Sequence, residues 1–194
     1  MAQFNSFYDI LDISLLQKFC VEHGKEKLYA KGECFVREGE TGRNFGFVKS
    51  GYFKYCTGRS NGEEAIGGFA FKNEALVDLS NSFMFGKPSN VTISAGCQSI
   101  VAEVTISDIK QYINIHYTNF LKDETSAIFS ELYKRYVNIL KKTPTERYIE
   151  LLNDHPQLFD IVPLQEIASY LLITPVYLSR IRKSIQNKKS KKLS

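Results

Sequence analysis

The sequence predicts an α+β protein in which an N-terminal antiparallel β-roll, of the double-stranded β-helix or jelly-roll type, is followed by helices. Three observations support this class. All 12 glycines lie between Gly24 and Gly96. Residues 123–142 contain neither glycine nor proline, and residues 163–186 have the apolar spacing of two short helices. Because glycine favours tight turns and weakens helices, a turn-rich half precedes a helical half.

The glycine-rich half alternates short β-prone runs with turn residues about every 8 to 12 positions, as antiparallel sandwiches and rolls do. Residues 45–48 and 52–55 are predicted to form a hairpin about a turn at 49–51. Later strands are expected at 91–94 and 100–105, with Ala95-Gly96 between them, and Gly67-Gly68 is interpreted as a strand kink.

Two helices are expected to flank the roll. The first spans residues 11–21, where apolar side chains have the spacing of one helix face, namely Leu11, Leu15, Leu16 and Phe19. The second spans 107–117 and is opened by Ser107, with Asp108 in its first turn.

A long helix is predicted over residues 123–142, where two apolar stripes run side by side. The first consists of Ile128, Leu132, Tyr136 and Ile139, and the second of Phe129, Tyr133, Val137 and Leu140. Two adjoining stripes need two partners. The simplest partners are the roll of the same chain and the same helix of a second subunit, with the first stripe as the dimer interface. One broad face buried within a monomer is the alternative.

The last third of the chain predicts a helix-turn-helix. Thr143, Pro144 and Glu146 have the pattern of a capping box that starts a new helix, and residues 153–156 end it. A first short helix then buries Leu164, Ile167, Ala168 and Leu171. A second begins at Thr174-Pro175 and buries Leu178, Ile181 and Ile185.

The outer face of this second helix is predicted to read DNA. It carries Val176, Ser179, Arg180, Lys183 and Asn187. Arginine suits guanine edges in the major groove, serine and lysine can hold phosphates, and valine can contact a thymine methyl. Residues 141–194 hold 10 basic and 5 acidic residues, which fits a polyanionic partner. A solvated basic face on an ordinary helical hairpin is the alternative.

Several classes of protein are disfavoured. The four cysteines form no C-x-x-C pair and are interpreted as reduced, mostly buried thiols, and the three histidines lack metal-ligand spacing. No metal, cofactor or catalytic site is therefore expected, and a cupin-type enzyme is the weakest hypothesis. Because no apolar run is long enough to cross a bilayer and the N-terminus is not a secretory signal, a cytoplasmic protein is expected.

The runs YAKGECFVREGETGRNFGFVKSGYFKY, TPTERYIELL and IASYLLITPVYLSRIRK resemble the Crp/Fnr family of transcription regulators. The resemblance covers nearly the whole chain and implies a sensor β-roll at 1–120, a dimerisation helix at 121–142 and a winged-helix-like helix-turn-helix domain at 143–194. It also implies a homodimer on near-palindromic double-stranded DNA, with a small-molecule effector and RNA polymerase as further candidate partners. A sensor or scaffold protein that does not bind DNA is the alternative function.

The resemblance gives Glu74, Lys87, Ser89 and Asn90 as the tentative effector site. Cyclic-nucleotide-binding members follow a helix-leading Gly-Glu with an arginine that holds the phosphate, but this chain has no arginine between Arg59 and Arg135. Because a buried phosphate needs a paired cation, cyclic AMP is predicted not to be the effector.

Three further departures from the family concern the DNA-binding domain. Leu172 replaces a turn glycine, so the turn either avoids positive φ or is strained. Val176 replaces a base-reading glutamate, so the preferred DNA site should differ. Residues 158–162 are short for the family's hairpin wing, which is expected to be reduced to a loop.

Overall fold

A computed structural model describes residues 4–9, 12–59, 62–117 and 119–192. Its N-terminal half consists of two four-stranded antiparallel sheets, which confirms the predicted α+β roll. One sheet has the order β1-β8-β3-β6, and its strands are β1 (Lys25–Tyr29), β8 (Ser99–Thr105), β3 (Asn44–Ser50) and β6 (Ala75–Leu76). The other has the order β2-β7-β4-β5, with β2 (Cys34–Val36), β7 (Thr92–Ala95), β4 (Tyr52–Gly58) and β5 (Glu64–Phe71).

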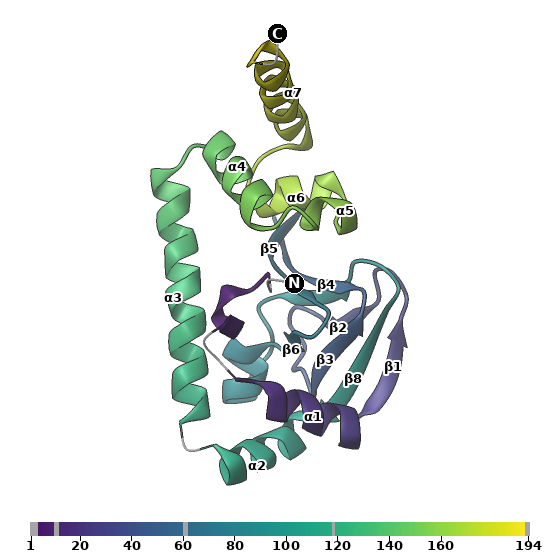
Figure 1. Cartoon of the computed structure of the whole chain (residues 1–194). Coiled ribbons are helices and arrows are strands. Elements are labelled where there is room, and N and C mark those ends of the chain that lie inside the picture. The colour runs from purple at the N-terminus through teal and green to yellow at the C-terminus, as the bar shows by residue number, and fades with distance from the viewer. Residues whose placement is uncertain (1–3, 10–11, 60–61, 118, 193–194) are drawn as a thin grey trace.

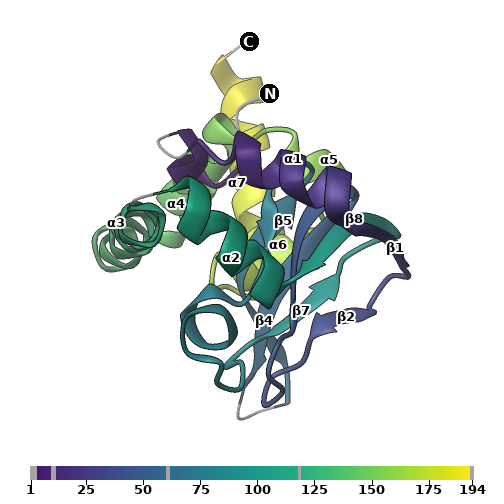
Figure 2. The same cartoon turned by 90° about the horizontal axis from the view of Figure 1, so that it is seen from below.

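Helices surround the roll and continue beyond it (Figure 1). A short turn, η1 (Ser6–Asp9), is followed by α1 (Ser14–His23), and η2 (Leu79–Phe83) lies between β6 and β7. After the last strand come α2 (Ile106–His116), α3 (Phe120–Lys141), α4 (Pro144–Asp154), α5 (Leu158–Ile161), α6 (Leu164–Tyr170) and α7 (Pro175–Lys192). Figure 2 shows α1 and α2 together over one end of the roll, with α3 to one side.

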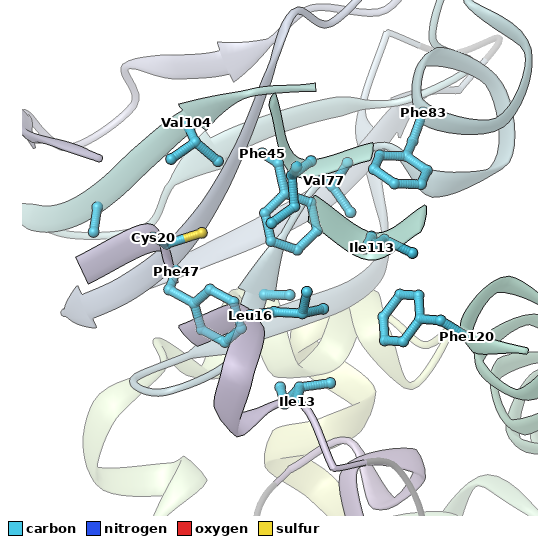
Figure 3. Close-up of a cluster of buried hydrophobic side chains, with 13 residues drawn as sticks. Ile13, Leu16, Cys20, Phe45, Phe47, Val77, Phe83, Val104, Ile113 and Phe120 are labelled. Atoms are coloured by element: carbon cyan, nitrogen blue, oxygen red, sulfur yellow. The ribbon is translucent and has the colours of Figure 1, made fainter. Parts of the chain in front are cut away.

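One hydrophobic core joins α1 and α2 to the first sheet (Figure 3). Leu16 and Cys20 of α1 meet Phe45 and Phe47 of β3, and Phe120 at the start of α3 closes the cluster. The first helix therefore faces the roll through Ile13, Leu16 and Cys20, whereas Leu15 is exposed. The predicted contact through Leu15 is wrong, and Leu11 lies outside the described residues.

The predicted hairpin of residues 45–48 and 52–55 is wrong. β3 pairs with β8 and β6, whereas β4 pairs with β5 and β7, so the two strands belong to opposite sheets. Gly51 lies between them at φ 78°, where an added Cβ would meet Ser99. The turn therefore carries the chain from one sheet to the other, which is how a roll is built from successive strands.

Two smaller predictions have definite outcomes. Tyr55 pairs with Gly68 and Cys56 with Ile66, so Gly67 is the extra residue of a β-bulge and the predicted kink is confirmed. The predicted cap Ser107 is wrong, because Thr105 is the N-cap of α2 and its side chain accepts the N–H of Asp108. The sequence allows the hydroxyl of either Thr105 or Ser107 to cap the helix. Because β8 ends at Thr105, the helix begins directly after it and Thr105 is the cap.

Helix α3 turns a mostly polar stripe toward its own chain. Phe120, Glu124 and Ala127 are buried, the carboxylate of Glu131 accepts the N–H of Phe7, and Arg135 donates to backbone carbonyls. The prediction that an apolar stripe covers the roll is therefore wrong. The small side chain of Ala127 lets the helix approach closely, and hydrogen bonds satisfy Glu131 and Arg135 at the contact.

Both predicted apolar stripes of α3 are largely exposed to solvent. Leu132 and Tyr136 are 57% and 58% exposed, and Ile128 and Ile139 are half-buried. In the second stripe Phe129, Tyr133 and Leu140 are also exposed. A single chain thus leaves a wide apolar surface on its longest helix without a partner among the described residues.

Candidate nucleic-acid interface and effector region

The C-terminal domain begins with a capping box. The Thr143 hydroxyl accepts the N–H of Glu146, the Glu146 carboxylate accepts the N–H of Thr143, and Pro144 takes the first turn of α4. Backbone and side-chain hydrogen bonds from Thr143 lower the pKa of Glu146. The helix ends at Asp154, before His155-Pro156, as the sequence predicts.

Helices α6 and α7 form the predicted helix-turn-helix. Ile167 and Ala168 of α6 are fully buried and share one cluster with Leu178 and Ile181 of α7. The Thr174 hydroxyl accepts the N–H of Tyr177, which caps α7 at the predicted position. Residues 158–161, where a wing hairpin would begin, form the short helix α5 instead of a loop, and the described residues from Thr143 onward contain no strand.

Of the two conformations predicted for the turn between α6 and α7, the structure has the strained one, with a residue at positive φ. Leu172 has φ 58°, a left-handed conformation that favours glycine. The N–H of Leu172 bonds the carbonyl of Ser169, and the N–H of Ile173 bonds that of Ala168. This pair of bonds is a Schellman motif, which ends α6 and orients the start of α7 even though the residue is leucine.

The five side chains predicted to read DNA lie together on the outside of α7. Val176 is 62% exposed, and Ser179, Arg180, Lys183 and Asn187 are exposed as well. Leu178 and Ile181, on the opposite side, are buried. In Figure 1, α7 projects away from the roll.

The first helix of the pair is docked on the roll. The Ser169 hydroxyl accepts the N–H of Ile66 at 3.1 Å and donates to the carbonyl of Glu64 at 3.0 Å. The Tyr52 hydroxyl donates to Glu166 at 3.0 Å, and the Lys54 ammonium lies 3.7 Å from the same carboxylate. Helix α6 therefore rests on β4 and β5 while α7 faces away.

The four residues of the tentative effector site do not share a hydrogen-bonded site. Glu74 is buried, and its carboxylate accepts the backbone N–H groups of Asn5 and Phe71 and the amide of Asn5 at 2.7 Å. Burial raises the pKa of Glu74 to about 7. Ser89 is buried and bonded to Val91, whereas Lys87 and Asn90 are exposed. Glu74 thus holds the N-terminal segment against the roll.

Asp78, and not Glu74, leads the helical segment that follows β6. It caps η2, and its carboxylate accepts the N–H and hydroxyl of Ser82 and the hydroxyl of Ser80. Sequence reasoning missed this residue, although an aspartate directly before Leu79 has the pattern of an N-cap. Its carboxylate already has three donors from its own segment.

The cysteines are free thiols, as predicted. Cys20 and Cys56 are buried, and burial raises the pKa of Cys20 to about 12. Cys34 and Cys97 are half-buried. No group of three histidine, cysteine, aspartate or glutamate residues that could hold a metal ion occurs in the described part of the chain. Within the same residues, no helix combines the length and apolar character needed to cross a bilayer.

Comparison with known proteins agrees with this architecture. The cyclic nucleotide-binding domain family matches residues 26–116. FixK2 from Bradyrhizobium japonicum has a TM-score of 0.69 and 18% identity, with 86% of each chain covered. The c-di-GMP responsive global regulator CLP from Xanthomonas campestris has a TM-score of 0.65 and 18% identity, covering 92% of this chain and 93% of that one.

A third structure shows the same likeness at lower identity. The catabolite activator protein from Thermus thermophilus has a TM-score of 0.55 and 12% identity, covering 94% of this chain and 87% of that one. Comparison with curated sequences found no match. Residues 26–116 therefore resemble the cyclic nucleotide-binding domain family, and the chain as a whole has the fold of Crp/Fnr-type regulators.

Proposed function

We propose that this protein is a dimeric transcription regulator that binds double-stranded DNA at preferred sites through α7. The observation that carries the proposal is the outward basic face of α7, where Arg180 and Lys183 are exposed while Leu178 and Ile181 anchor the helix. A recognition helix needs this division between anchored and open faces in order to enter a major groove. A cytoplasmic location is part of the same proposal.

Dimer formation is part of the same proposal. Of the four residues predicted to form the interface, Leu132 and Tyr136 are exposed on α3, and Ile128 and Ile139 are half-buried. A two-fold axis along two such helices would let the same residues of both subunits meet. It would also present two α7 helices to successive major grooves, which a near-palindromic site requires.

The roll is proposed to respond to something other than cyclic AMP. The residues between Arg59 and Arg135 include no arginine, and Lys87 is exposed at the surface. A phosphodiester buried near Ser89 would lack a paired cation. Calorimetry with cyclic AMP at micromolar concentration should therefore show no binding, and measurable heat of binding would overturn this part.

A gel-shift titration against a pool of genomic fragments, at two salt concentrations, tests DNA binding. A regulator should lose affinity steeply as salt rises, because phosphate contacts release counterions, and it should still enrich particular fragments. A sensor or scaffold protein with a basic face would show weak binding without enrichment. That second outcome would remove the regulator assignment.

A further inference from the structure

Residues 4–9 contact the roll, α3 and the C-terminal helices (α4–α7) at the same time. The ring of Phe4 lies among rings of β5, α6 and the end of α4, and the amide of Asn5 donates to the roll. The N–H of Phe7 donates to Glu131 of α3 at 2.9 Å. Figure 1 shows this segment, in purple, between α3 and the roll. We name residues 4–9 the N-terminal strap.

The ring of Phe4 joins the roll to the C-terminal helices. Its centre lies 5.8 Å from that of Phe69 and 5.3 Å from that of Phe71, both in β5. It also lies 5.0 Å from the ring of His155 and 5.7 Å from that of Tyr170. Aromatic rings at these separations attract each other, and their contact removes apolar surface from water. One side chain of the strap therefore binds to both parts of the molecule.

Asn5 and Tyr8 anchor the strap on the roll. The backbone N–H of Asn5 donates to Glu74 at 3.2 Å, and its side-chain amide donates to the same carboxylate and to the carbonyl of Phe69. The Tyr8 hydroxyl accepts the N–H of Ala75 at 3.0 Å. Because a buried carboxylate is costly without hydrogen-bond donors, Glu74 favours the position in which Asn5 supplies them.

The roll and the C-terminal helices meet at an apolar cluster. Ile66 and Phe69 of β5 lie in it together with Ile167 and Leu171, and Phe4 packs against it. The hydrogen bonds that join α6 to β5, directly or through α3, are exposed or partly buried. Water competes with such bonds, so apolar contacts contribute more of the attachment. Because Phe4 contacts rings from both parts, its removal exposes apolar surface of both and weakens the attachment.

We propose that the N-terminal strap holds the C-terminal helices on the roll, and that displacing it lets α6 and α7 change their position relative to β5. The strap is fixed to the roll by Asn5 and Tyr8 and to α3 by Phe7, while Phe4 reaches the C-terminal helices. These attachments form together only when all three parts lie as they do in this structure. A change that moves α3 therefore displaces the strap, and displacement of the strap loosens α6 in return.

Distances within the full chain test the strap without DNA. Spin labels are placed at Lys31 on the roll and Gln165 on α6, which are both exposed, through a non-natural amino acid that leaves the cysteines unlabelled. The labelled chain is diluted into unlabelled chain, so that pulsed electron spin resonance measures distances within one chain even when two chains associate. The unaltered protein should give one narrow distance, because its strap is closed.

Two variants open the strap. Phe4→Ala removes the ring, and Asn5→Ala removes the side-chain amide. Each should shift the equilibrium toward the displaced strap about 10-fold, as expected for a lost aromatic contact or a lost hydrogen bond to a charged group. A second or broader distance should therefore appear, and its share should be largest when both substitutions are combined. Asn5→Ala leaves the apolar contacts in place, so it keeps the test open if Phe4→Ala does not fold.

Matched controls are Phe85→Ala, at a 65% exposed position, and Asn114→Ala on the outside of α2. Both should give the distance of the unaltered protein. One unchanged distance in the folded strap variants would overturn the proposal, and so would an equal change in the controls. Only the consequence for α7 as a reading helix rests on the proposed function. Because no DNA is present, the strap can fail while DNA binding holds, and the reverse.

Discussion

Helices α3 and α7 each pack one face on the chain and expose the other, but the two exposed faces have opposite chemistry. That of α3 is apolar, with Leu132 and Tyr136 more than half exposed, and that of α7 carries Arg180 and Lys183. Apolar surface of this extent is suited to another protein surface, whereas an open basic face is suited to a polyanion. The difference supports the proposal that a second copy of the chain binds at α3 and double-stranded DNA at α7.

The largest expected effect comes from a charge on the exposed face of α3. Leu132→Asp places two carboxylates in a symmetric interface, where neither has a partner. The dimer dissociation constant should rise by about 100-fold or more, which corresponds to about 2.7 kcal/mol. Sedimentation velocity over a concentration series measures this. Ile115→Asp, at a 69% exposed position on α2, is the control and should leave association unchanged. If Leu132→Asp formed a dimer as tight as that of the unaltered protein, the exposed face of α3 would not be the dimer interface.

The packed face of α3 predicts a pH dependence. Burial raises the pKa of Glu124 to about 7 from an ordinary value of 4.5. A folded-state pKa above the unfolded one stabilises the fold below pH 4.5, and this stability is lost as pH rises through 7. Glu124→Gln removes the titration and should raise the free energy of unfolding at pH 8 by up to about 3 kcal/mol, with little change at pH 4.

Urea unfolding at the two pH values measures the effect of Glu124→Gln. Glu22→Gln on α1 is the control, because the Glu22 side chain is 53% exposed and is not part of the packed face of α3. Comparing each variant with the unaltered protein removes contributions from other groups such as Glu74. Equal gains at both pH values would show that charge burial on this face is not the cause.

The exposed face of α7 is tested by Arg180→Ala. Loss of an arginine that contacts a guanine edge should cost about 1–3 kcal/mol and relax the choice at one base pair. Affinities for the preferred site and its single-base variants, from gel shifts at fixed salt, measure both changes. Arg37→Ala, on the roll, changes net charge equally and should leave base preference intact. Unchanged preference in Arg180→Ala would move the reading surface away from this helix.

The smallest effect concerns the turn that orients α7. Leu172→Gly removes the strain of a left-handed leucine at a position that is 46% exposed. The free energy of unfolding should rise by about 0.5–1 kcal/mol. Val21→Gly, at an exposed position within α1, should lower it by about 0.5–1 kcal/mol instead. A loss of stability in Leu172→Gly would mean that the leucine side chain contributes more than its backbone costs.

The sequence predicts local features of the helices well, because their signals lie within a few residues. The capping box at Thr143, the cap at Thr174 and the buried pair Leu178 and Ile181 all follow from spacing and side-chain chemistry. Exposure of Arg180 follows from the same helical period. These elements required no knowledge of distant parts of the chain.

Features that depend on distant contacts are the ones missed. Strand propensity cannot tell that β3 and β4 belong to different sheets, since that depends on pairing with β8 and β5. Nor does the sequence show that Glu74 bonds Asn5, 69 positions away. The inward stripe of α3 was missed because Glu124 and Arg135 are polar, and only the tertiary fold buries Glu124 and gives Arg135 its backbone acceptors.

The guanidinium of Arg135 links the β-bulge of the roll to the end of α6 and so restricts how these two parts can move relative to each other. Its Nη1 donates to the carbonyl of Gly67 in the β-bulge, its Nη2 donates to the carbonyl of Tyr170 at the end of α6, and its Cζ lies 3.9 Å from the centre of the Tyr170 ring. Since the two nitrogens belong to one rigid plane, the bulge and the end of α6 keep a fixed separation while both bonds hold. A rotation of α3 would therefore carry the bulge and α6 together, and in the proposed dimer the spacing of the two α7 helices would follow the angle between the paired α3 helices.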